Sequence, residues 1–434
     1  MEWTADTNYY RMGPKEVESA PDESGVLQAK RDIEPWLSAV FQSEHLSVLL
    51  GSGFTTAVSH VAGVTSTTMS EIQFGDLGKL PYEDRVNEFA RESAKAMGRG
   101  DSNIEDQIRA ANTLLEGLKI IRDSNVTVWE DAINRVLGSF MISILETEAG
   151  IERAIRDGNH LVERVLVSLL LSFASRTASR ERLNLFTTNY DRLVEYGCDL
   201  VGLRSIDRFV GALTPIFRSS RIDVDMHYNP PGIRGEPRFL EGVVRYTKLH
   251  GSIDWRFENN QLRRYTIPFG APSNHTDVVS RRSESVMIYP NPAKDVETLE
   301  FPYADLFRDF SSALCRPNSA LVTYGYGFGD DHINRVLADM LTIPSTHLVI
   351  ISWDHANGRI ESFLDKVGRH AQISLMVGHH FGDIQNLVNY YLPKPSIDEI
   401  SIRKAALVTR RTSATEDQPS TVLDSQSIYG GERP

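Results

Sequence analysis

Two polar residues, Asn189 and His250, follow short apolar runs with the composition of buried β-strands, at 183–186 and 243–249. If both runs are parallel strands of one sheet, Asn189 and His250 lie at carboxyl ends of strands. That edge is where open α/β sheets bind their ligands. An amide and an imidazole converging there favour a site for a polar, ribose-containing ligand.

Each of these residues also has an ordinary structural interpretation. Asn189 can hold a ribose hydroxyl or orient a water without adding charge, but asparagine is also a common turn former. His250 can transfer a proton near neutral pH, although a single histidine is more often structural. The strand-end position of His250, followed by Gly251 and Ser252, favours a functional role.

Four further apolar runs, at 46–50, 320–324, 347–351 and 373–377, predict additional strands. Together the six strands end in polar or glycine-bearing loops, which at one sheet edge would form a nucleotide crevice. Those loops are 51–53, 187–189, 250–252, 325–330, 352–354 and 378–380.

The glycines of two of these loops allow close approach of the backbone to a ligand. Gly51 and Gly53 precede a predicted helix, whose N-terminus supplies free N–H groups for a pyrophosphate. Thr56 takes the place of the third glycine of the dinucleotide fingerprint. A plain strand–turn–helix connection therefore explains this loop about equally well.

The strand and helix patterns together predict an α/β fold, a Rossmann-like parallel sheet with helices on both faces plus a helical insertion domain. Continuous apolar runs that alternate with helices are typical of a parallel sheet buried on both sides. Between the first two strands, apolar residues recur at spacings of three and four over 83–180, which predicts helices. Residues 102–105 have the form of a capping box. Residues 205–240 and 256–300 are expected to be irregular, and the first of these stretches leaves room for hairpins.

These patterns divide the chain into four parts. We expect a loose N-terminal arm over 1–35, a sheet domain over 36–60 and 181–392, a helical insertion over 61–180, and a flexible tail over 393–434. The tail is expected because its composition turns polar after Pro393.

Composition narrows the possible ligands and the cellular compartment. The 434 residues carry a net charge of −12, so direct nucleic-acid binding is not expected. Two cysteines cannot form a four-thiolate zinc site. The pair His379 and His380 is not expected to bind metal, because adjacent side chains on a strand diverge. We expect a cytoplasmic protein, since no signal peptide or membrane-spanning run is evident.

Taken together, the motifs resemble the sirtuin-like family, in its bacterial NADase branch rather than its deacylase branch. Segments 51–54, 187–191 and 248–252 resemble the first phosphate loop, the Thr-x-Asn-x-Asp element and the segment with the catalytic histidine. Segment 324–334 resembles the ribose-side loop of the defence-associated branch. The resemblance spans about 46–390. The zinc-ribbon cysteines of the deacylases are missing, so an acyl-lysine groove is not expected.

The resemblance implies cleavage of the nicotinamide–ribose bond of NAD, with NAD as substrate and no zinc. Asn189 would position the attacking water and a ribose hydroxyl, and His250 would accept a proton. Asp191 would cap the next helix and lie in the site. The remaining binding residues implied for NAD are Gly51, Ser52, Gly53, Phe54 and Thr188 on the pyrophosphate and ribose side, and Gly325, Gly327, Phe328 and Ser352 on the adenosine side.

The resemblance also implies a wider role and leaves two alternatives open. An enzyme that destroys NAD would serve as a defence effector, as a homo-oligomer and in some relatives beside a HerA-like hexameric ATPase. One alternative is a module that senses NAD or ADP-ribose without hydrolysing it and regulates a partner ATPase. The other is a residual protein deacylase.

Overall fold

The computed structural model describes residues 8–15, 18–19, 23–67, 69–75, 78–96, 102–220, 226–228, 238–259, 261–275, 285–287 and 301–394. Of the tail expected over 393–434, residues 395–434 lie outside this part. No helix in the described ranges has the length and apolar character needed to cross a bilayer.

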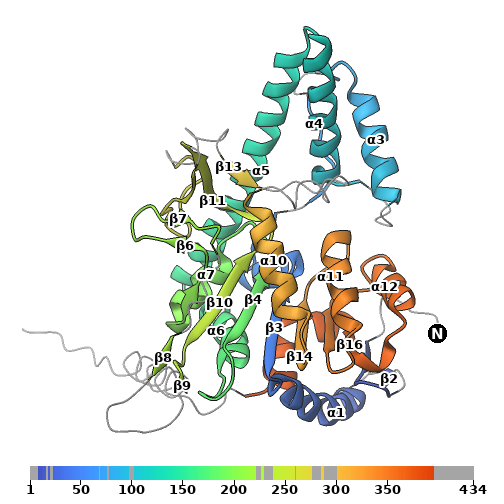
Figure 1. The fold of residues 1–434 in the computed structure, drawn as a ribbon, viewed down its shortest axis with the longest axis vertical. Helices are drawn as coiled ribbons and strands as arrows, with labels where there is room; N and C mark the ends of the chain where they lie inside the picture. Colours follow the sequence, from blue (N-terminus) through green and yellow to red (C-terminus); the bar gives the residue numbers. More distant parts are fainter. Residues whose placement is uncertain are drawn as a thin grey trace, which may run out of the picture.

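A parallel sheet forms the centre of the molecule, as the strand pattern predicts (Figure 1). In the described part of the chain it has nine strands, in the order β2-β1-β16-β15-β14-β3-β4-β10-β5. The strands from β16 to β5 are parallel to one another. Their bounds are β3 (His45–Leu50), β4 (Leu183–Thr187), β5 (Arg204–Ile206), β10 (Val243–Lys248), β14 (Ser319–Tyr324), β15 (His347–Ser352) and β16 (Ile373–Val377).

Helices cover both faces of this sheet. Successive side chains of a strand point to opposite faces, so each face of these strands carries apolar side chains for helices to cover. On β3, Leu46, Val48 and Leu50 belong to one apolar core and Leu49 to another. The first core packs against α1 (Glu23–Phe41), α2 (Ser52–Ala62), α6 (His160–Ala174) and α7 (Leu193–Val201); the second packs against α10 (Tyr303–Leu314), α11 (Asp331–Leu341) and α12 (Arg359–Val367). The fold class inferred from the sequence is therefore confirmed.

Between β3 and β4 the described chain is mainly helical, with α3 (Glu83–Ala96), α4 (Ile104–Ile121) and α5 (Val126–Arg156) standing above the sheet (Figure 1). These helices share a core around the fully buried Trp129. Helix α6 instead packs on α2 and α7 beside the sheet. The capping box lies one residue later than expected, because Asn103 caps α4 and Asp106 bonds back to it.

The segments expected to be irregular contain short antiparallel strands. A five-stranded sheet has the order β13-β11-β12-β7-β6, so part of 256–300 is regular. The bounds are β6 (Phe209–Val210), β7 (Ile216–Phe217), β11 (Gly251–Glu258), β12 (Gln261–Arg264) and β13 (Ser285–Met287), with β8 (His227–Tyr228) and β9 (Arg238–Phe239) as a separate pair. The short helix η2 (His370–Gln372) precedes β16. After β16 the chain forms α13 (His379–Gly382), α14 (Ile384–Asn386) and η3 (Leu387–Tyr391).

The N-terminal segment differs from the loose arm expected over 1–35. Strand β1 (Tyr9–Arg11) pairs antiparallel with β16 and with β2 (Glu18–Ser19), and α1 already begins at Glu23. Tyr10 and Met12 are 3% and 2% exposed. Burial of this apolar surface stabilises the segment against the sheet, a contact that its polar average composition conceals.

Beside the pairing of β1 with β16, the hydroxyl of Ser374 on β16 makes a side-chain junction with this part of the chain. The backbone N–H of Gly13 and the indole N–H of Trp36 both donate to Ser374 Oγ, at 3.0 and 2.9 Å. His347 Nε2 lies 2.9 Å from the same oxygen. A hydroxyl accepts two hydrogen bonds and donates one, so Ser374 donates to an unprotonated His347 Nε2.

Acid is therefore expected to weaken this junction. Burial, assisted by the charge of Arg11, lowers the pKa of His347 to about 4, whereas an unfolded histidine has a pKa near about 6.5. Between these two values the folded state binds fewer protons than the unfolded state. The contribution of His347 to the free energy of unfolding is therefore fully present above about pH 6.5 and is lost as the pH falls toward 4. We expect His347→Gln to flatten the pH dependence of the thermal midpoint in that window. The exposed His370→Gln variant should keep the wild-type slope, and equal slopes in all three proteins would contradict the assignment.

Candidate functional site

The loops that follow the neighbouring strands β3 and β14 touch through their backbones. Gly51 N–H donates to Tyr324 O and Gly53 N–H to Gly325 O, both at 3.0 Å. A Cβ at Gly51 would lie 2.6 Å from Tyr326 Cα, and one at Gly53 would lie 2.7 Å from Gly325 Cα. The close approach that these glycines permit is thus between two loops of the protein.

Gly325 is the least replaceable of these glycines. Its φ of +63° is a left-handed conformation, and its Cβ would lie 2.6 Å from Phe54 N. We expect Gly325→Ala to lower the free energy of unfolding by about 2–4 kcal/mol. The matched change Gly117→Ala adds a methyl group on α4 where nothing lies within 4 Å, and should raise it by about 0.5–1 kcal/mol. Chemical denaturation measures both, and an unaltered Gly325→Ala protein would refute the packing argument.

Asn189 joins the loop after β4 to the loop after β3. Its Nδ2 donates to Gly51 O and to Thr55 Oγ1, both at 2.9 Å. The Thr55 hydroxyl in turn donates to Asp191 Oδ2 at 2.7 Å. Because both amide hydrogens are used within the protein, Asn189 meets any ligand through Oδ1, as a hydrogen-bond acceptor. Asp191 Oδ1 also accepts from the backbone N–H of Leu193 at the start of α7, although the N-cap residue of that helix is Arg192 and not Asp191.

His250 faces a second histidine that the sequence analysis did not single out. Its Nε2 lies 3.2 Å from Nε2 of His332 on α11, and the two residues are 3% and 7% exposed. A hydrogen bond between two ring nitrogens requires that one donates and the other accepts. The pair therefore holds one shared proton, and His332 orients the His250 ring.

Asp330 completes a group that could hold a metal ion. The ligand atoms of His250, Asp330 and His332 all lie within 4.8 Å of one another, and two imidazoles with a carboxylate suit divalent transition metals. The expectation that the site holds no metal was based on the number of cysteines and on His379 and His380. It did not consider this group, so it stays a prediction.

The two adjacent histidines lie on the helix α13 rather than on a strand. The His379 ring stacks on Trp353, whereas His380 Nε2 lies 2.8 Å from the Tyr391 hydroxyl.

Asn189 and His250 line one cavity of about 290 Å³ at the carboxyl edge of the sheet. The strand ends thus bring together the two residues proposed as catalytic. Four of the expected binding residues also line it, namely Ser52, Thr188, Asp191 and Gly327.

The other expected binding residues lie behind the cavity wall. Gly51, Gly53 and Gly325 form the loop contact described above. Phe54 is fully buried against Tyr324, Phe328 packs on Tyr326 and Phe363, and Ser352 Oγ donates to Asp354 O at 2.8 Å. Their side chains shape the edge of the sheet rather than the cavity surface.

Several lining residues had no role in the sequence analysis. Thr55 lies one turn into α2, and Arg359 donates from α12 to Gly327 O at 2.6 Å. Glu105 comes from the helical insertion and accepts a hydrogen bond from the Tyr190 hydroxyl at 3.1 Å. His332 could have been found, because it belongs to the segment 324–334 already selected for its glycines. Nothing local in the sequence marked Arg359, and Glu105 stood out only as part of the expected capping box.

Comparison with known families identifies one part of the chain. Residues 183–371 match the SIR2-like domain, which supports membership of the sirtuin-like family. The matched range contains Asn189, His250 and His332, but not the loop after β3 or the helices α3 to α6. No curated protein matches the chain. SIR2-like domains bind NAD as a substrate, which is consistent with an NAD-dependent activity.

Proposed function

We propose that this chain, whose residues 183–371 match the SIR2-like domain, hydrolyses NAD to nicotinamide and ADP-ribose. The observation that supports this most directly is the meeting of Asn189 and His250 in one cavity. One residue offers a neutral acceptor, and the other is an imidazole with a histidine partner at 3.2 Å.

The bond to be broken, between nicotinamide and C1′ of the ribose, separates with oxocarbenium character, as in glycoside hydrolysis. Nicotinamide leaves as a neutral ring, so no strong general acid is required. Water adds to C1′ and releases a proton. Asn189 Oδ1 accepts a hydrogen bond from this water or from a ribose hydroxyl. His250 accepts the proton, directly or through a hydroxyl.

The remainder of the dinucleotide is assigned to the loops around the cavity. Ser52 and Thr188 lie beside the N-terminus of α2, where the helix dipole favours a pyrophosphate. We place the adenosine side toward Gly327, with Gly325, Phe328 and Ser352 supporting that wall from behind. Gly51, Gly53 and Phe54 support the opposite wall.

Alanine variants test the two catalytic assignments. Asn189→Ala and His250→Ala should each lower the rate of nicotinamide release from NAD at least about 100-fold. Losses of this size are usual when a group that transfers a proton, or a group that positions a reactant, is removed. Chromatography measures the nicotinamide. Exposed His370→Ala and Asn112→Ala serve as controls. If both site variants released nicotinamide at the wild-type rate, the proposal would be wrong; NAD binding without release by the wild type would instead identify a sensor.

His332 is expected to act through His250. We predict that His332→Ala lowers kcat about tenfold or more with a smaller effect on KM, because the His250 ring loses its orienting partner. The pH profile of kcat/KM should also shift, since the pair shares a proton. His332→Gln, which can still hydrogen-bond, should recover part of kcat. A loss of protein stability alone would leave the pH profile unchanged.

The wider role follows from the resemblance and is part of the proposal. We assign the chain to the defence-associated NADase branch, acting as a homo-oligomer and regulated by a HerA-like ATPase. Constitutive loss of NAD would harm the cell, so such an enzyme requires control. NAD turnover by the purified chain, with and without that ATPase, tests the regulation. Formation of acetyl-ADP-ribose from an acetylated peptide would instead indicate a deacylase.

A further inference from the structure

The two histidines at the first cavity are separated by nearly the distance between two ligands of one metal ion. His250 Nε2 and His332 Nε2 lie 3.2 Å apart. Zinc binds imidazole nitrogen at about 2.0–2.1 Å, so two nitrogens on one tetrahedral ion lie about 3.3–3.4 Å apart. A small tilt of the two rings would therefore direct both nitrogens at a single ion.

Asp330 supplies a third ligand, an oxygen, to the same point. One of its carboxylate oxygens and one ring nitrogen from each histidine all lie within 4.8 Å of one another. Asp330 is the N-cap residue of α11, yet its side chain makes no capping hydrogen bond to that helix. Its carboxylate lies with the histidines instead. Two imidazoles and one carboxylate form a ligand set that zinc and other divalent transition ions accept.

Hydrogen bonds within the loop after β14 hold Asp330 and His332 in position. Asn334 Nδ2 donates to Phe328 O at 3.0 Å. The Tyr326 hydroxyl donates to Asn334 Oδ1, also at 3.0 Å. The loop that carries two of the three ligands is thus fixed by groups outside the ligand set. Support of this kind orients metal ligands and tightens metal binding.

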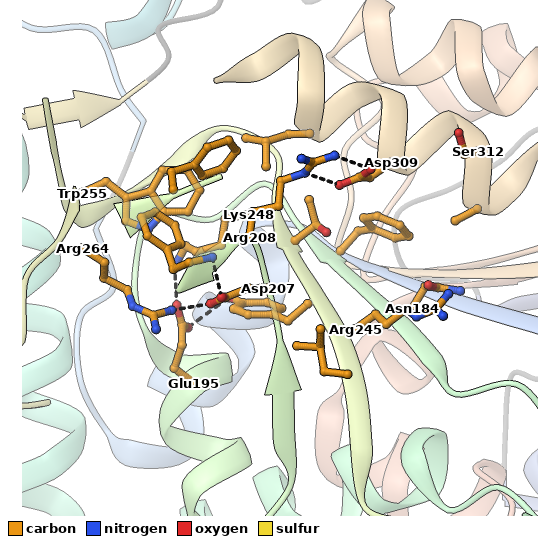
Figure 2. A pocket seen from close by; sticks show the side chains of 18 of the residues that line it. Asn184, Glu195, Asp207, Arg208, Arg245, Lys248, Trp255, Arg264, Asp309 and Ser312 are labelled. Atoms are coloured by element: carbon orange, nitrogen blue, oxygen red, sulfur yellow. Dashed lines mark hydrogen bonds and ion pairs between the residues drawn. The ribbon is translucent and has the colours of Figure 1, made fainter. Parts of the chain in front are cut away.

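The charged groups of a second cavity, beneath α10, are paired with one another instead (Figure 2). Asp309 accepts two hydrogen bonds from Arg208, at 2.6 and 2.8 Å, and Glu195 pairs with Lys248 at 3.1 Å. Within the part of the chain that the structure describes, no other group of three histidine, cysteine, aspartate or glutamate side chains brings its ligand atoms so close together. A divalent metal ion is therefore expected to prefer the group around His250.

We propose that His250, Asp330 and His332 bind Zn²⁺ or a similar divalent transition ion. In the metal-free pair one Nε2 carries the shared hydrogen. When the ion binds, that ring carries its hydrogen on Nδ1, so both Nε2 atoms coordinate the metal. His250 and Asp330 line the cavity, and water from the cavity completes the coordination. Mg²⁺ prefers oxygen ligands and is not expected to bind.

The ion is expected to inhibit the enzyme, a consequence that rests on the proposed NAD hydrolysis. With Nε2 on the metal and hydrogen on Nδ1, His250 has no lone pair with which to accept a proton. The charge of the ion also opposes the positive charge of the nicotinamide ring and of the oxocarbenium-like transition state. Zinc would thus regulate the reaction and would not be its cofactor.

Metal titration of the full chain tests the site. After metal has been removed with a chelator, Zn²⁺ is added in competition with a chromogenic chelator. Asp330→Asn, which keeps the side-chain shape but removes the charge, and His332→Ala should each weaken zinc binding at least about tenfold. His379→Ala, which removes an exposed histidine next to His380, should bind zinc like the wild type.

Cobalt provides a measurement that does not depend on the folding of any variant. Co²⁺ accepts the same ligands as Zn²⁺, and its visible absorption changes when imidazole nitrogens replace water around it. The metal-free wild-type chain should show such a band with Co²⁺, and Zn²⁺ should abolish it by replacement. A wild-type chain without the band would contradict the site.

Inhibition is measured as nicotinamide release, with each protein compared with its own metal-free rate. Asp330→Asn should require at least about tenfold more zinc than the wild type for the same inhibition. The proposal is overturned if the wild type binds zinc no more tightly than Asp330→Asn and His332→Ala, or if zinc leaves the wild-type rate unchanged or raises it. Zinc binding by a chain that releases no nicotinamide without metal would instead refute the proposed hydrolysis and support the metal site.

Discussion

The candidate site depends on the backbone contact between the loops that follow β3 and β14. Gly53 N–H reaches Gly325 O at 3.0 Å only because neither residue carries a side chain at the interface. Asn189 then ties the next strand to the same contact by donating to Gly51 O. Three adjacent strand ends are thus joined, and the polar groups around the cavity are held before any ligand arrives. Such preorganisation is what positions reacting groups for catalysis.

A buried ion pair holds the helical insertion to this edge. Glu148 on α5 accepts hydrogen bonds from the backbone N–H of Arg192, at 2.7 Å, and from its guanidinium group, at 2.5 Å. Arg192 comes directly after Asp191, so the pair connects α5 to the loop that carries Asn189. Removing either partner of such a pair would leave an uncompensated buried charge, which is strongly destabilising. The insertion consequently contributes Glu105 to the cavity wall while its outer helices extend away from the sheet.

Local patterns were sufficient for six of the parallel strands and for most helices, but not for β1, β2, β5 or the short antiparallel strands. The apolar runs of β3, β4, β10, β14, β15 and β16 are continuous, and a parallel sheet buried on both faces requires that composition. Finer features required the structure. Two pairs of residues, Ser102 with Glu105 and Asn103 with Asp106, fit the pattern of a capping box. In the structure the second pair forms the box, and Ile104 at the start of α4 is 5% exposed. The N-terminal segment is polar on average, but the burial of Tyr10 and Met12 and the hydrogen bond from Gly13 N–H to Ser374 Oγ anchor it.

Asn189 and His250 could be selected from the sequence because a strand's end and its following residue are local properties, and the parallel order of strands then places both at one edge. The same reasoning could not find the neighbour of His250 or the wall residues from other elements. His332 lies 82 residues from His250, and Glu105 reaches the cavity through a separate group of helices. Such neighbours are invisible in the sequence, because the distance between residues far apart along the chain is set only once the chain is packed.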